Sequence, residues 1–152
     1  MKAFCFALEN VLAWRRSELE RAELQFQRSA AALAAVEQAI AELNAEGIRT
    51  EILVRGWSPV SGSDLAALGA FRNRLHQRRG ELADRQSACL GRLGAERAAL
   101  LEARRRVRLL ERLRERRWKD WRTAADKEME ALAAETHLAR WRGRSKQDGP
   151  HA

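Results

Sequence analysis

The strongest constraint on the fold is a heptad pattern of apolar residues near the start of the chain. One series recurs every seven residues at Leu12, Leu19, Phe26, Leu33 and Ile40. A companion series, offset by four residues, contains Leu8, Arg15, Ala22, Ser29, Val36 and Leu43. Alternating spacings of four and three form the seam of a coiled coil, although Arg15 and Ser29 weaken one side of it. The pattern predicts a helix over residues 4–46.

Residues 47–62 have a different composition, which predicts a tip between two helices. They contain three glycines and Pro59, and this proline prevents an uninterrupted helix through the region. Ser63 is then the expected N-cap of a second helix, with Asp64 in its first turn, where a negative charge suits the helix dipole.

A second heptad pattern follows and predicts a helix over residues 63–142. Its two series are Leu68, Leu75, Leu82 and Cys89, and Leu65, Leu93, Leu100 and Val107. Residues 143–152 are polar and contain Pro150, so we expect a disordered tail there. Residues 1–142 are predicted to form a single coiled-coil domain.

Two amphipathic helices joined by a short tip should fold back on each other. We therefore predict an all-α fold, a long antiparallel two-helix coiled-coil hairpin with an extended C-terminal helix. If residues 46 and 63 flank the turn, the numbers of paired residues add to about 109. Phe26 then lies near Leu82, Leu33 near Leu75, and Leu8 near Leu100.

The predicted helices differ in length, so the first ends opposite about residue 105. Residues 106–141 would then have no partner within the chain. They still carry an apolar stripe: Leu110, Leu113, Trp118, Trp121, Ala125, Met129 and Leu132. A long uncovered stripe indicates a binding surface or an oligomer contact.

The charge of the chain is concentrated beside this stripe. Residues 1–60 have a net charge of −1, whereas residues 61–152 have a net charge of +9. Within residues 104–122 there are ten basic and three acidic side chains. A patch of this sign attracts an acidic protein, nucleic acid or anionic lipid.

Other functional classes have little support in the sequence. There is no GxxxxGK[ST] or GxGxxG motif, and the three histidines and two cysteines lack metal-site spacing. We expect no enzyme activity, no cofactor and no metal. A reduced cytoplasmic location is expected, because Cys5 and Cys89 should lie far apart and no signal peptide or transmembrane stretch is recognised.

The basic run and the stripe together provide the candidate partner-binding residues. They are Arg112, Arg114, Arg116, Arg117, Trp118, Trp121, Leu110, Leu113 and Met129. Tryptophans three residues apart on a helix favour a protein interface over base stacking. A basic coiled coil that binds nucleic acid remains the alternative, and self-association through the overhangs is a third possibility.

Both ends of the chain are similar to the signatures of the FliJ family of flagellar export proteins. In FCFALENVLAWRRSELERAELQF, the matching residues are Phe6, Leu8, Val11, Leu12 and Arg15. In VRLLERLRERRWKDWRTAADKEMEAL, they are Leu110, Glu111, Leu113, Arg116, Arg117, Trp121, Glu128 and Leu132. The chain departs from the family where Trp121 replaces a commoner Tyr, Met129 a frequent Gln, and Ala133–Ala134 an acidic pair.

This resemblance implies a role in flagellum biogenesis, bacterial flagellar protein export, type III secretion and chemotaxis. Family members are cytoplasmic, non-enzymatic coiled coils, peripheral to the inner membrane at the export apparatus. They resemble the central stalk of rotary ATPases. One end inserts into the hexameric export ATPase, and the stalk contacts the cytoplasmic domain of the export gate; escort of export chaperones is also attributed to them. The resemblance implies that the end with both termini enters the ring.

Overall fold

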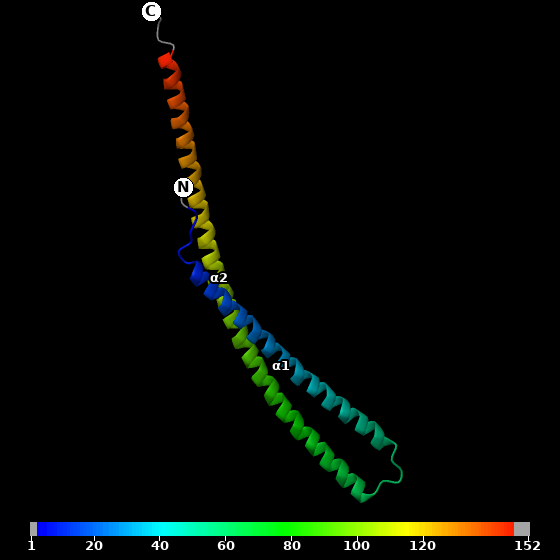
Figure 1. The fold of residues 1–152 in the computed structure, drawn as a ribbon. Helices are drawn as coiled ribbons and strands as arrows, with labels where there is room; N and C mark the ends of the chain where they lie inside the picture. Colours follow the sequence, from blue (N-terminus) through cyan, green and yellow to red (C-terminus); the bar gives the residue numbers. More distant parts are fainter. Residues whose placement is uncertain (1–2, 148–152) are drawn as a thin grey trace, which may run out of the picture. The chain divides into compact units, whose positions relative to one another are not determined.

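The fold is an all-α helical hairpin, which confirms the predicted class (Figure 1). A computed structural model describes residues 3–147 of the chain, with side chains to residue 142. Helix α1 spans Glu9–Arg55 and helix α2 spans Gly62–Gln147, and a loop of residues 56–61 joins them. The described part of the chain contains no strand.

The predicted seam is the buried face of α1. Both heptad series are buried or half-buried from Leu12 to Leu43, and they include the two polar members, Arg15 and Ser29. Leu12 has no exposed surface, and Ser29 is only 7% exposed. Leu8 precedes the helix and is exposed. Leucine burial along one stripe therefore provides the packing that stabilises the helix pair.

The seam of α1 continues beyond the predicted end of the helix. Gly47, Thr50 and Val54 occupy the next three seam positions, and α1 ends only at Arg55. The predicted tip over residues 47–62 is therefore shortened to the loop of residues 56–61. A glycine within a helix costs about 1 kcal/mol relative to alanine, which nearby packing can offset. Gly47 is buried, and Leu75 and Arg79 of α2 lie next to it.

The predicted register is wrong because the turn lies later in the sequence than expected. Gly47 lies next to Leu75, and Arg104 forms an ion pair with Glu23 at 3.3 Å. The two residue numbers add to 122 in the first pair and to 127 in the second, whereas the predicted sum was about 109. Phe26 shares a surface hollow with Leu100 and not with Leu82. In these three places, α1 therefore packs against a more C-terminal part of α2 than predicted.

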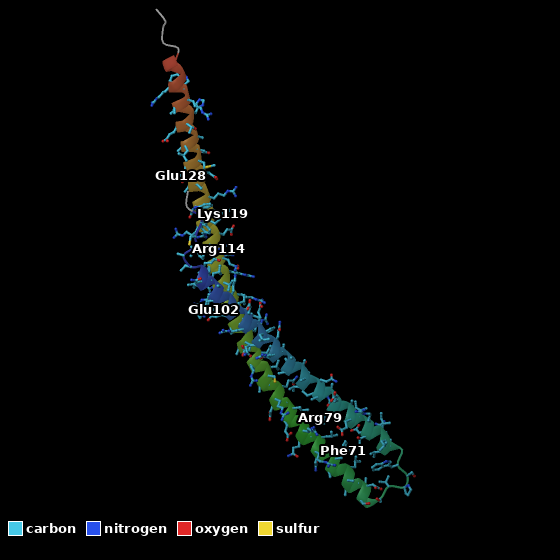
Figure 2. All side chains as sticks on the ribbon, viewed as in Figure 1. Phe71, Arg79, Glu102, Arg114, Lys119 and Glu128 are labelled. Atoms are coloured by element: carbon cyan, nitrogen blue, oxygen red, sulfur yellow. The ribbon has the colours of Figure 1, made fainter. Side chains whose placement is uncertain are left out.

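The seam of α2 follows its predicted positions from Leu68 onward. Leu82, Leu100 and Val107 are buried, and the remaining members are half-buried: Leu68, Leu75, Cys89 and Leu93. Leu65 is 60% exposed, because the first turn of α2 lies beyond the packed part of the pair. Phe71 also lies on the buried side, and Figure 2 labels it near the loop end of α2.

The N-terminus of α2 is capped by Ser61 and not by the predicted Ser63. The Ser61 backbone N–H donates to Asp64 Oδ2 at 2.9 Å, and the Asp64 N–H donates to Ser61 Oγ at 3.2 Å. This reciprocal arrangement is a capping box. The Ser61 hydroxyl also donates to Asp64 Oδ2 at 2.6 Å. These hydrogen bonds, from the hydroxyl first and then the amide, lower the pKa of Asp64 below its ordinary value.

Both helices run through two compact units. One unit is Arg16–Arg105, and the other contains the described residues of Met1–Arg15 and Arg106–Ala152. The assignment of residues 1–142 to a single domain stays a prediction. Of the predicted disordered tail, residues 143–147 belong to α2, and residues 148–152 lie outside the described part of the chain.

Candidate partner-binding site

The second unit brings the N-terminal segment, residues 3–8, against α2. This segment is not helical, because α1 begins at Glu9 and not at residue 4 as predicted. Phe6 is 8% exposed, and the ring of Phe4 lies 5.9 Å from that of Trp121 with an interplanar angle of 55°. At the start of α1, Glu9 Oε2 accepts a hydrogen bond from Arg114 Nε at 2.9 Å. Figure 2 labels Arg114 on this part of α2.

This packing corrects the prediction that α2 has no partner from residue 106 onward. Val107 and Ala125 are buried, and Leu110, Leu113 and Trp121 are half-buried. An extended segment advances about 3.3 Å per residue, whereas a helix advances about 1.5 Å. A short non-helical segment therefore reaches along more of α2 than a helix of the same length. Leu8, expected near Leu100, instead shares a cleft with Leu113 and Trp121.

The uncovered part of α2 is residues 126–142, and all of these residues are exposed. Figure 1 shows this part of the helix continuing beyond the N-terminal segment, and Figure 2 labels Glu128 on it. Its large apolar side chains are Met129, Leu132, Leu138 and Trp141, which are 51–65% exposed. At about 100° per residue, Met129 and Leu132 share one face, and Leu138 and Trp141 share the opposite face.

The nine candidate residues do not form one continuous surface. Leu113, Arg117 and Trp121 line a cleft beneath the N-terminal segment, with a volume of about 490 Å³. Arg112 and Arg116, both exposed, do not line this cleft. The remaining candidates do not line the cleft either: Leu110 is half-buried, Arg114 pairs with Glu9, Trp118 is 39% exposed, and Met129 is on the uncovered part.

Three tryptophans of this unit have neighbours that suit protein packing more than base stacking. Trp121 lies against Phe4, and the guanidinium of Arg122 lies 5.3 Å from the ring centre of Trp118. On α1, the guanidinium of Arg15 lies 4.5 Å from the ring centre of Trp14, which is 52% exposed. Arginine over an indole face is a cation–π contact. These rings are already engaged on one side, which leaves less of each face for a nucleotide base.

Some of the charges in the basic run are compensated within the chain. Arg114 pairs with Glu9, and Lys119 Nζ lies 2.7 Å from Glu115 Oε1 one helical turn away. The hydrogen bond from Lys119, together with its positive charge, lowers the pKa of Glu115. Arg104, at the start of the run, pairs with Glu23, and both residues belong to the unit Arg16–Arg105. Ten basic side chains against three acidic ones still leave residues 104–122 strongly positive.

The sequence interpretation missed the contribution of the N-terminal residues. Phe4, Phe6 and Glu9 hold the segment and the start of α1 against α2. Their signal in the sequence was two aromatic residues just before the heptad pattern, at positions that a helix from residue 4 would have placed off the seam. Because residues 106–141 were expected to have no partner within the chain, the packing of these N-terminal residues against α2 was not predicted.

The described residues were also compared with the requirements of a metal site and of a membrane-spanning helix. They contain no group of three or more His, Cys, Asp or Glu side chains that could hold a metal ion. Cys5 is an exposed free thiol and Cys89 a half-buried one. Across residues 3–147, no helix has the length and apolar composition needed to cross a membrane.

A comparison with family models gives one match that covers most of the chain. The model described as flagellar FliJ protein matches residues 4–144. Searches of curated proteins and of solved structures find no match.

Proposed function

The chain belongs to the FliJ family of flagellar proteins, and we propose that it is a non-enzymatic stalk that couples the export ATPase ring to the export gate. Family membership makes it a component associated with flagellar protein export. The specific partners are our proposal. The ring binds the end of the chain that contains residues 126–142, and the cytoplasmic domain of the gate binds elsewhere along the stalk.

The observation that carries this proposal is the uncovered part of α2. Residues 126–142 are exposed throughout, yet they carry apolar side chains on two opposite faces. A helix that lies on a flat surface needs only one apolar face, whereas a helix that is apolar on opposite sides suits an enclosed environment. The central opening of a ring would surround the helix in this way.

The charge of the adjoining basic run supports the same partner class. Residues 104–122 have seven more basic than acidic side chains. Carboxylates at the entrance of a ring would neutralise this charge and would orient the helix as it enters. The function we propose needs no catalytic group in this chain. The proposed location of the protein is the cytoplasm, at the inner-membrane export apparatus. Export chaperones are further proposed partners.

Stimulation of ATP hydrolysis by the cognate export ATPase tests the proposal. Two double variants change one apolar face each: Met129→Asp with Leu132→Asp, and Leu138→Asp with Trp141→Asp. All four side chains are more than half exposed, so the hairpin should keep its helix content. We expect each variant to lose about tenfold in apparent affinity for the ATPase, because each replaces two apolar side chains that the proposed complex would bury.

Glu130→Gln is the matched control, because it changes an exposed polar residue in the same part of α2. It should stimulate like the wild-type chain. Circular dichroism of every variant checks that the helices are intact. Undiminished stimulation by both double variants would refute the role of residues 126–142.

A further inference from the structure

A cleft is lined by both the N-terminal segment and α2, and the stalk role itself does not need it. Its volume is about 490 Å³. The N-terminal wall includes Phe4, Cys5 and Phe6, and the α2 wall is formed by Leu113, Arg117 and Trp121. Pockets of a few hundred Å³ with mainly apolar walls and a few polar groups are typical binding sites for a small ligand or an anchoring side chain.

The walls of the cleft determine what could enter it. Phe4 and Trp121 both line the cleft and pack against each other, so an aromatic pair holds part of the apolar lining in place. Arg117 is the charged residue of the lining, and it is exposed. Arg117 belongs to the run of residues 104–122, which has a net positive charge. An apolar group that is accompanied by carboxylates complements both features.

We propose that this cleft receives an apolar side chain from an acidic segment of the partner protein. The inference rests on the proposed function, in which that partner is the export ATPase. The anchoring side chain lies between the N-terminal segment and the α2 wall, in contact with Leu113 and Trp121. A flanking carboxylate accepts hydrogen bonds from the Arg117 guanidinium. An aromatic and an arginine beside a pocket are the usual elements of a binding hot spot.

Cys5 gives a direct measurement of occupancy, because it is exposed and lines the cleft. The substitution Cys89→Ala leaves Cys5 as the single thiol, and its alkylation rate with N-ethylmaleimide is then followed. The first probe is an acidic peptide with one phenylalanine among glutamates. We expect it to slow alkylation of Cys5, whereas peptides with serine for the phenylalanine, or lysines for the glutamates, should leave the rate unchanged.

Two arginine variants distinguish a specific contact in the cleft from general attraction by the positive charge of the run. Arg117→Gln removes the guanidinium that lines the cleft, and Arg112→Gln removes the same charge from an exposed position outside it. Loss of a hydrogen bond to a charged group should weaken the phenylalanine peptide about tenfold in the first variant. The second should have a smaller effect, from long-range charge alone. Equal weakening would overturn the assignment of Arg117.

Ala7→Phe fills the cleft from the N-terminal side without removing a packing residue. This variant should no longer bind the peptide while its helix content stays the same. If it binds as well as the unsubstituted chain, the cleft is not the binding site.

An experiment with the cognate export ATPase distinguishes failure of this inference from failure of the proposed function. It measures both the stimulation of ATP hydrolysis and the protection of Cys5 from alkylation. If the ATPase is stimulated and Cys5 is protected, both stand. If it is stimulated while Cys5 reacts at its free rate, the cleft assignment is overturned and the stalk proposal stands. Absence of stimulation overturns the proposed function and, with it, the identity of the partner. If protection instead increases with the concentration of the chain alone, a second copy is the occupant, and the inference fails in favour of self-association.

Discussion

The substitution Gly47→Ala tests the feature in which structure and sequence interpretation differ most, namely the helix beyond residue 46. Gly47 lies inside α1, eight residues before its last residue, and is not at a positive φ angle. A Cβ atom added there would lie 3.4 Å from Nη2 of Arg79 and 3.5 Å from Cδ1 of Leu75. These are close but ordinary contacts, and the nearer atom is at the end of a flexible side chain.

The expected effect on stability follows from helix propensity. Alanine is better than glycine in a helix interior by about 1 kcal/mol, so Gly47→Ala should stabilise the chain by about that amount. For a chain of this size, the midpoint of thermal unfolding should rise by about 2–4 °C. Thermal unfolding followed by circular dichroism at 222 nm measures the change.

Two control substitutions make this measurement specific. Gly80→Ala lies within α2 with no atom near the added Cβ, and it should stabilise by a similar amount. Gly56→Ala lies in the connecting loop and should gain no helix propensity. If Gly47→Ala behaves like Gly56→Ala, the helix ends at residue 46 and the register described above is refuted. A marked loss of stability would mean that Arg79 cannot move away from the new methyl group.

Three further predictions concern the packing, the cap and an ion pair. Leu12→Ala should reduce the free energy of unfolding by about 3 kcal/mol, because Leu12 is fully buried; urea unfolding measures it, and a loss close to zero would contradict this burial. Ser61→Ala should cost about 1 kcal/mol by removing the cap of α2. Because the folded pKa of Asp64 lies below its ordinary value of 3.8, its ionised form contributes stability above that pH and loses it as pH falls through the folded pKa. The difference in urea midpoint between the wild type and Asp64→Asn should therefore be constant near neutral pH and disappear in acid; a difference that persists there would argue against the ionised cap. A double-mutant cycle of Glu9→Gln and Arg114→Gln should give a coupling energy of about 0.5 kcal/mol, because both side chains are about half exposed, whereas a coupling of several kcal/mol would indicate a shielded pair.

The sequence was informative about the seam because burial in a coiled coil follows a strict period. Leu12, Phe26 and Leu43 lie where the heptad pattern predicts, and so do Leu82 and Leu100 in the second helix. The end of the first helix was misjudged because Gly47 was interpreted as a break. Thr50 and Val54 keep the same spacing, so the pattern itself contained the correct end.

The candidate site was harder to predict, because it depends on register and on a segment without regular structure. A shift of the turn changes every pairing between the helices, although each seam position stays the same. The contact of Phe4 with Trp121 follows no helical period, so the heptad pattern does not indicate it. Of the candidate residues, Leu113, Arg117 and Trp121 lie together, whereas Arg112, Arg116 and Met129 lie elsewhere on α2. Their role in binding stays a prediction.

The excess positive charge of residues 104–122 has a consequence for the speed of assembly. A charged patch acts over about 8 Å at physiological ionic strength, which is farther than any contact. It accelerates the encounter with an oppositely charged partner and has less influence on dissociation, which depends on desolvated contacts. Salt should therefore slow the capture of an acidic partner by this end of the chain, while the lifetime of the complex, once formed, changes little.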